Sequence, residues 1–443
     1  MLVDEASTET GTNGASNFDV IVLGAGISGL VSASILLQQG YKRVLVVDEY
    51  NHLGGNHIDC ALGDYTFDVG SFLFQYNSPL LNHFPELLPL YVPVSPSFGR
   101  LNPQGLITRY PISVKDDVLS TGPIEVSRIL LSVVFARLFR RQPRNARDFA
   151  QYWIGDRLLK RSGLEHYIER FHGVPAERID VSFAEKRMGW IKRNASLDYL
   201  RRSLRPSLKA PTNQQQQLVR PRGGFAHLYR TAAQRLENYG ASFLLGAGIQ
   251  SLDKEGGTFH LGTGEQRFAA GRVVSTIPIE RCQALCGIPR DSGLQTVTLL
   301  SLFFSFSGMR GFPQSILYNF SHAGAWKRLT MHSDFYGRSQ DREFFSVEVN
   351  ADHVSGSVEA AEQDFRRHVS ANGLFVGDLT LEGSHTLPNA YPIYTNRADE
   401  RAAEAIAALN ALGIESFGRQ GGFNYQPTAQ ISTLEAEAAL SRN

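Results

Sequence analysis

The residues with the clearest chemical use are three glycines near the N-terminus, Gly24, Gly26 and Gly29, followed by Asp48. The β-branched run directly before Gly24 predicts a buried strand, and the segment after Gly29 predicts a helix. Such a turn lets the backbone approach a pyrophosphate, whose charge the free N–H groups at the helix N-terminus would bind. A carboxylate after the next strand can accept hydrogen bonds from ribose hydroxyls. The spacing therefore predicts a dinucleotide-binding loop.

A second glycine pair, Gly54 and Gly55, follows Asp48 and Glu49 closely and precedes Asn56. A simple NAD-binding fold has no use for a glycine pair at this place. The pair would let the backbone lie against the middle of an extended cofactor such as FAD. We therefore favour FAD over NAD as the dinucleotide.

These motifs resemble the family of FAD-dependent amine oxidases, protoporphyrinogen oxidases and UDP-galactopyranose mutases, which carry them in this order. Further matches continue in the family's order to about Leu440, and they occupy residues 65–71, 222–224, 246–249, 273–278 and 418–425. The resemblance implies that FAD is bound without a covalent link, because Phe423 stands where a flavin-attaching cysteine could follow the glycines at 421–422.

The resemblance also assigns cofactor-binding residues. Ile249 would meet the adenine through its backbone, and a last helix from about Thr428 would direct its N–H groups at the flavin pyrimidine. The full set of expected cofactor-binding residues is Gly24, Gly26, Ile27, Ser28, Gly29, Asp48, Glu49, Gly54, Gly55, Asn56, Ile249, Gly418, Arg419 and Thr428.

The expected fold class is α/β, with a Rossmann-like FAD-binding domain and a second, interleaved α+β substrate domain. The FAD-binding domain would comprise residues 18–78, 218–295 and 395–443. The substrate domain would comprise residues 79–217 and 296–394. Residues 1–17 would form a disordered tail, because they are acidic, rich in Ser, Thr and Gly, and lack an apolar signal-peptide segment.

The sequence shows no Ser/His/Asp set, phosphate-loop lysine or metal-ligand cluster, so a flavin would have to supply the chemistry. In one reading, an oxidoreductase passes a hydride from a C–N or C–C bond to flavin N5. Residues 173–188 and 219–229 look most like protoporphyrinogen oxidase-like proteins.

Two other readings stay open. A UDP-galactopyranose mutase-like enzyme would rearrange a nucleotide sugar on reduced FAD, and residues 51–56, 109–111, 389–394 and 418–419 resemble that pattern. The histidine that such mutases carry after the flavin-side glycine is replaced here, where Ser71 and Phe72 follow Gly70. A non-catalytic escort-type scaffold for small GTPases would not need the phosphate loop, which is intact here.

The expected substrate pocket rests on arginines and tyrosines. Arginine suits a diphosphate because its guanidinium fork matches phosphate oxygens, and tyrosine can stack and hydrogen-bond. The candidates are Arg109, Arg187 and Arg419 for a diphosphate, and Tyr391, Tyr394 and Tyr425 for the pocket wall. Lys327, beside Trp326, is a candidate counterpart of the lysine that lies near the flavin in amine oxidases. We expect instead that the Lys327 side chain is exposed to solvent.

The amino-acid composition limits the classes of partner that we expect this protein to bind. The 443 residues include 44 Lys and Arg against 43 Asp and Glu, and this balance argues against nucleic acid as a partner. Three cysteines cannot form a disulfide framework and are expected to be buried free thiols. We therefore expect a cytoplasmic enzyme with a small-molecule substrate and no metal, and its oligomeric state stays open.

Two further segments carry expectations. The apolar stretch at 124–139 is too short and too charged to span a bilayer, so it predicts a core helix of the second domain, with a weak membrane-surface contact as the alternative. The basic, Gln-rich run at 201–222 predicts a mobile loop, either a lid over an anionic substrate or a solvated connector.

Overall fold

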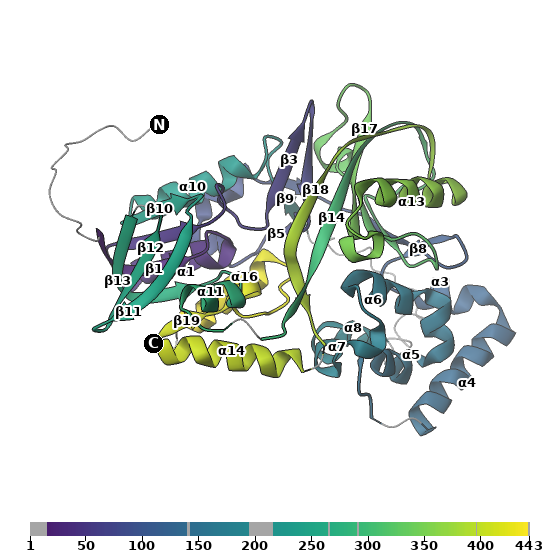
Figure 1. The fold of residues 1–443 in the computed structure, drawn as a ribbon. Helices are drawn as coiled ribbons and strands as arrows, with labels where there is room; N and C mark the ends of the chain where they lie inside the picture. Colours follow the sequence, from purple (N-terminus) through teal and green to yellow (C-terminus); the bar gives the residue numbers. More distant parts are fainter. Residues whose placement is uncertain are drawn as a thin grey trace.

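A computed structural model describes residues 16–139, 142–194, 216–264, 266–289, 292–395 and 397–441. Its two large β-sheets are each built from several separate stretches of the chain (Figure 1). One sheet takes strands from residues 16–48, 241–275 and 414–416, and the other from 98–109, 295–350 and 375–393. The chain therefore passes repeatedly between two interleaved halves, and the expected α/β class with a Rossmann-like part is confirmed.

The first sheet has a parallel core in the order β10-β2-β1-β13-β19, with the β11 and β12 hairpin attached to β13. Its strands are β1 (Ser16–Leu23), β2 (Val44–Asp48), β10 (Ala241–Leu245), β11 (Ile249–Glu255), β12 (Thr258–Thr263), β13 (Gln266–Ser275) and β19 (Ile414–Ser416). Every residue of β2 is buried, as expected of a parallel strand covered on both faces. The carboxyl ends of these strands meet at one edge, which is where ligands bind in such sheets.

The second sheet has the order β18-β14-β17-β16-β15-β7-β8. Its strands are β7 (Phe98–Leu101), β8 (Ile107–Arg109), β14 (Gln295–Arg310), β15 (Ile316–Asn319), β16 (Trp326–Met331), β17 (Glu343–Asn350) and β18 (Phe375–Ile393). The long antiparallel pair of β14 and β18 begins near the carboxyl edge of the first sheet. It extends from there along the second sheet to the end that lies away from the first sheet (Figure 1). These two strands tie the halves together.

Smaller elements fill the remaining space. Short sheets are formed by β3 (Ile58–Leu62) with β4 (Tyr65–Val69), and by β5 (Phe74–Gln75), β9 (Gln217–Val219) and β6 (Val92–Val94). The α-helices are α1 (Ile27–Gln38), α2 (Leu80–His83), α3 (Val114–Asp117), α4 (Pro123–Phe139), α5 (Ala146–Ser162), α6 (Leu164–His172), α7 (Val181–Arg187), α8 (Gly189–Asn194), α10 (Phe225–Glu237), α11 (Ile279–Leu285), α12 (Ser333–Tyr336), α13 (Val358–Ala371), α14 (Ala398–Leu412), α15 (Gly418–Gly421) and α16 (Ala429–Leu440). Short 3-10 turns occur at Pro85–Leu90, Leu119–Thr121, Ala176–Arg178 and Ala351–Val354.

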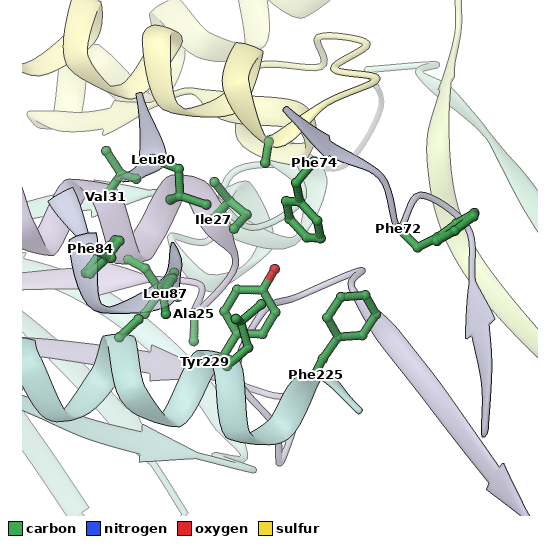
Figure 2. Packing of buried hydrophobic residues seen from close by; sticks show 14 of the residues in the cluster. Ala25, Ile27, Val31, Phe72, Phe74, Leu80, Phe84, Leu87, Phe225 and Tyr229 are labelled. Atoms are coloured by element: carbon green, nitrogen blue, oxygen red, sulfur yellow. The ribbon is translucent and has the colours of Figure 1, made fainter. Parts of the chain in front are cut away.

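A buried apolar cluster packs against the glycine turn and the start of α1. Ile27 and Val31 of α1, Phe74 of β5, and Phe225 and Tyr229 of α10 all belong to this cluster (Figure 2). The strand, helix and last-helix positions expected around this region are confirmed by β1, α1, α10 and α16. Close packing here fixes where the glycine backbone lies.

Three expectations about the remaining segments meet a different outcome. Helix α4 is not a core helix, because most of its apolar side chains are exposed. In the stretch at 201–222, residues 201–215 lie outside the described residues, but Gln217–Val219 form strand β9 instead of a loop. Of the expected tail, residues 1–15 also lie outside the described part, and residues 16 and 17 begin β1.

Candidate functional site: a glycine-lined cleft joined to an aromatic cavity

A cleft of about 450 Å³ lies at the carboxyl edge of the parallel sheet. Ten of the expected cofactor residues line it, namely Gly24, Gly26, Ile27, Ser28, Asp48, Glu49, Gly54, Gly55, Asn56 and Arg419. Four others do not: Gly29, Ile249 and Gly418 lie behind its wall, and Thr428 lines a neighbouring cavity. Most of the N-terminal motif residues are thus gathered around one space.

The glycine turn leaves its helix open toward this cleft. Gly26 is the N-cap of α1 and supplies no side-chain hydrogen bond to the first turn. A helix N-terminus without a side-chain cap presents N–H groups and a partial positive charge to an anion. Gly29 serves packing instead, because a Cβ there would lie 1.8 Å from the carbonyl oxygen of Gly24. The turn therefore has one face with uncapped N–H groups, which suits an anion, and one packed face.

The second glycine pair closes one side of the cleft. The Gly54 amide donates to the carbonyl oxygen of Ala25 at 2.9 Å, so the two glycine segments are held side by side. Gly54 also has a φ of +98°, and a Cβ there would lie 2.5 Å from the ring of Tyr229. His57 stands beyond it, hydrogen-bonded to the Tyr229 hydroxyl, and burial lowers the pKa of His57 to about 3. The sequence requires glycine here for packing as well as for access.

Asp48 fixes the two turns that frame the cleft. Its carboxylate accepts from the amide of Ala25 at 2.6 Å and from that of Tyr50 at 2.9 Å. Burial raises the pKa of Asp48, and these two N–H donors oppose that shift. Since Asp48 still lines the cleft, it can both hold the loops and face a ribose.

Neighbouring residues explain why Ile249 is not at the cleft surface. Arg281 pairs with Glu49 at 3.0 Å and also donates to the carbonyl oxygen of Ile249 at 2.7 Å. The amide of Ile249 donates to Ala247 at 2.9 Å. Both backbone groups of Ile249 are therefore engaged within the protein, whereas Arg281 and Glu49 line the cleft. Arg281 is a cleft residue that the sequence analysis missed.

The C-terminal segment forms the opposite wall. Thr428 is the N-cap of α16, and its hydroxyl accepts from the amide of Ile431 at 3.3 Å. Arg419 donates to the carbonyl oxygen of Gln426. Glu435 of α16 accepts from the amide of Gly418 at 3.2 Å, which explains why Gly418 lies behind the wall. The segment reaches the cleft through Arg419 and Gln426.

A second cavity of about 330 Å³ adjoins the cleft, and both are lined by Asn56 and Arg419. Its walls are strongly aromatic. The aromatic lining residues are Phe72, Tyr110, Tyr167, Phe171, Tyr318, Tyr391 and Tyr425. Gly70 and Ser71, from the turn that the resemblance places near a flavin, also line it.

Three charged side chains reach this aromatic cavity from the second sheet. Lys327 is 3% exposed, and its Nζ lies 3.2 Å from Oε2 of Glu348, which also pairs with Arg328. The expectation of an exposed Lys327 is therefore wrong: β16 lies inside the sheet and buries it. Burial lowers the pKa of Lys327, with Glu348 opposing that shift, while both cations together hold the pKa of Glu348 low against its own burial.

The structure places some of the expected pocket residues at the aromatic cavity and others away from it. Tyr391 and Tyr425 line the aromatic cavity, and the Tyr391 hydroxyl is hydrogen-bonded to Lys327. Arg109 is exposed on β8 and lines neither cavity, whereas its neighbour Tyr110 does, stacked on Tyr318 with ring centres 4.0 Å apart. The side chain of Arg187 lies outside the described part of the structure.

Tyr394 lies behind the cavity wall and supports it. Its hydroxyl donates to the carbonyl oxygen of Phe423 at 3.0 Å and accepts from the amide of Tyr425 at 2.7 Å. Tyr394→Phe would leave both backbone groups without this partner, so we expect the free energy of unfolding to fall by about 1–2 kcal/mol. Urea titration would measure this change.

Tyr91 provides a matched control for that substitution. Tyr91 is as buried as Tyr394, but its hydroxyl has no hydrogen-bond partner within the described part of the chain. Tyr91→Phe is therefore expected to leave stability unchanged or to raise it. An equal loss in the two variants would show that Tyr394 does not hold the wall through its hydroxyl.

None of the three cysteines is among the described residues that line the cleft or the aromatic cavity. Cys282 is buried and Cys60 and Cys286 are half-buried, and all three are free thiols. Within the described residues, no group of three or more His, Cys, Asp or Glu side chains is placed to hold a metal ion.

Comparison with known proteins gives local sequence matches. Residues 22–86 match the family model of the NAD(P)-binding Rossmann-like domain. UDP-galactopyranose mutase of Mycoplasma genitalium is 50% identical over 72 residues, which is 16% of this chain and 18% of that protein. The chloroplastic prolycopene isomerase of Arabidopsis thaliana is 46% identical over 69 residues, 15% of this chain and 11% of that protein. These matches span less than a fifth of each relative.

Solved structures resemble nearly the whole chain. Reduced UDP-galactopyranose mutase superposes with a TM-score of 0.75 at 16% identity, covering 96% of each chain. A protein from Exiguobacterium sp. 255-15, described as a putative protoporphyrinogen oxidase, gives 0.72 at 16% identity, covering 97% of this chain and 99% of that one. Putrescine oxidase bound to putrescine gives 0.58 at 13% identity, with coverage of 97% and 99%. The resemblance to this group is confirmed at the level of the fold.

Proposed function

We propose that this protein is an enzyme that binds FAD non-covalently in the cleft and oxidises a small molecule held in the aromatic cavity. The observation that carries this proposal is the junction of the two spaces at Asn56 and Arg419. A dinucleotide placed with its phosphates at α1 would extend along the cleft toward this junction. A substrate in the aromatic cavity would then meet the far end of the cofactor.

The residues of the cleft fit FAD in three respects. The N-terminus of α1 is uncapped by any side chain, and the substitution-sensitive glycines bring backbone to the surface. Asp48 lies at the end of β2, where a ribose would be bound. None of the described residues lining either cavity is a cysteine, which supports binding without a thioether link.

FAD bound here would supply an acceptor for a hydride at N5. The chain's own part is to orient the substrate and to exclude water, for which the stacked Tyr110 and Tyr318 provide a rigid wall. The hydroxyl of Tyr391 and the charges of Lys327 and Glu348 provide the polar contacts that fix one orientation.

Rearrangement of a nucleotide sugar on reduced FAD is the second candidate function. It is favoured by the excess of cations at the aromatic cavity, where Lys327, Arg328 and Arg419 face the single carboxylate of Glu348. Two uncompensated positive charges suit a diphosphate. The similarity to UDP-galactopyranose mutase points the same way. A flavin-free escort scaffold gains no support from a cleft of this kind.

One experiment separates these candidates. Protein reconstituted with FAD would be mixed anaerobically with amines or with nucleotide sugars, in the oxidised form and after reduction by dithionite, while the flavin spectrum and products are followed. We expect the oxidised flavin to bleach with a reducing substrate and to recover its colour when an electron acceptor is added. Product formed from a nucleotide sugar only in the reduced form would establish the second candidate instead. Protein that stays colourless with added FAD would exclude both.

A further inference from the structure

Helix α4 exposes an unusual number of apolar side chains. Among the described residues, fifteen large apolar side chains are exposed, and seven of them belong to this one helix of 17 residues. They are Ile124, Leu130, Leu131, Val134, Phe135, Leu138 and Phe139, with exposed fractions between 52% and 72%. The other eight are spread over the rest of the described chain, as is ordinary for protein surfaces.

The exposed side chains share one face of the helix. At 100° per residue, Ile124, Leu131, Phe135 and Leu138 fall on the side opposite Ile129 and Ala136, which are each 2% exposed. That buried side packs on α5, which approaches closely because Gly155 has no Cβ to meet Ser132. Glu125 also pairs with Arg157 of α5 at 2.6 Å. Helix α4 is therefore apolar on two opposite faces, and α5 covers only one.

The charged side chains of α4 on and beside this face are basic. At 100° per residue, Arg128 falls between Phe135 and Phe139 on the exposed face, and Arg137 falls next to Leu130 at its edge. The acidic residue of α4, Glu125, falls on the side of α5, where it pairs with Arg157. The whole chain has a net charge of only +1, so these two arginines give the face a local positive charge on a nearly neutral molecule. Arg128, on α4 itself, has a side chain that is 61% exposed.

We propose that the exposed face of α4 lies on the surface of an anionic lipid bilayer. An apolar helix face beside arginines matches a membrane interface, where the apolar side chains enter the acyl boundary and the cations contact phosphate headgroups. Within the described residues, no helix is long and apolar enough to cross a membrane. Helix α4 would lie in the plane of the surface, at the outer end of the molecule, away from the parallel sheet (Figure 1).

The charge distribution selects this occupant over a second copy of the chain. In a twofold-symmetric pair joined through α4, Arg128 and Arg137 of both copies would be brought together, and their repulsion would oppose association. An anionic surface gains from the same charges. Net positive charge next to the apolar face therefore favours lipid.

Vesicle flotation tests the proposal. The FAD-loaded full chain would be mixed with vesicles of phosphatidylcholine, with or without about one third phosphatidylglycerol, and the bound fraction measured. We expect binding to the mixed vesicles, about tenfold weaker binding to pure phosphatidylcholine, and a further decrease when salt is added. The variant Leu131→Gln/Phe135→Gln/Leu138→Gln is expected to lose at least about a hundredfold in partition coefficient.

A matched control removes three exposed apolar side chains elsewhere. The variant Tyr239→Gln/Met309→Gln/Val376→Gln changes residues that are at least 58% exposed and lie outside α4, and it is expected to bind vesicles like the unmodified chain. Both variants should keep the flavin spectrum and the melting temperature of the unmodified protein, because the altered side chains face solvent. An unmodified chain that stays unbound on anionic vesicles would overturn the proposal. Equal loss in the control, or a dimer that only the α4 variant disrupts, would also overturn it.

Discussion

Replacing Gly26 by alanine is expected to weaken FAD binding by about a hundredfold or more, equivalent to about 3 kcal/mol, while the apoprotein keeps its stability. The backbone of Gly26 has φ −75° and ψ −177°, which any residue adopts. An added Cβ would lie 3.6 Å from the Cα of Gly55, an ordinary contact. The new methyl group therefore fits the empty fold but occupies the surface where a pyrophosphate would approach.

Flavin titration would measure the affinity of Gly26→Ala for FAD, and thermal unfolding of the apoprotein would measure its stability. Gly271→Ala is the control, because Gly271 is exposed on β13 and the nearest atom to its Cβ would be 3.9 Å away. Gly29→Ala should unfold the turn itself, since its Cβ would collide with Gly24. Unchanged FAD affinity in Gly26→Ala would mean that the phosphates do not bind at this turn.

Glu348→Gln is expected to lower the free energy of unfolding by about 3–5 kcal/mol at neutral pH. The Glu348 side chain is 5% exposed and is paired with both Lys327 and Arg328, so its neutral replacement leaves two buried cations facing each other. Asp399→Asn gives the comparison, because the pair of Asp399 and Lys186 is exposed, and its loss should cost less than about 1 kcal/mol.

The loss of stability in Glu348→Gln should depend on pH because Lys327 titrates. Burial lowers the pKa of Lys327 below its ordinary 10.5, and loss of Glu348 lowers it further. Above the folded-state pKa the native protein binds fewer protons than the unfolded chain, so stability rises with pH up to about 10.5. The defect of Glu348→Gln should therefore be full below the folded-state pKa of Lys327 and shrink as the pH rises through that pKa toward 10.5. Urea titrations followed by the fluorescence of buried Trp326 would measure it, and a small defect that does not vary with pH would contradict the buried pairing.

The part of the site that was predictable is local in sequence. Gly24, Gly26 and Gly29 could be interpreted because the strand and helix that they join are adjacent in the chain, and Asp48 follows at the end of the next strand. Even there the roles divide in space: Gly29 packs the turn, and Asp48 holds the backbone of Ala25 as well as facing the cleft.

The aromatic cavity was not predictable in the same way, because it depends on pairings between distant strands. Lys327 reads as a surface residue until β16 is placed between β15 and β17, and its partner Glu348 is recognisable only from that register. Arg109 and Tyr110 differ by one position, and only the fold decides which of them reaches the cavity. The exposure of α4 could not be predicted for a related reason, since apolar periodicity does not indicate which faces of a helix other elements cover.

The far wall of the cleft comes from the last described elements of the chain, and this has a consequence for the protein during its synthesis. Helix α16 lies against α1, where Gln39 donates to the carbonyl oxygen of Leu440 at 2.9 Å and His83 lies 3.1 Å from Glu437. A nascent chain that has just completed α14 already has the glycine turn at residues 24–29 but lacks Arg419 and Gln426. The proposed flavin site would therefore be completed only after α15 and α16 have been synthesised, and flavin colour would distinguish chains that contain these helices from chains terminated before them.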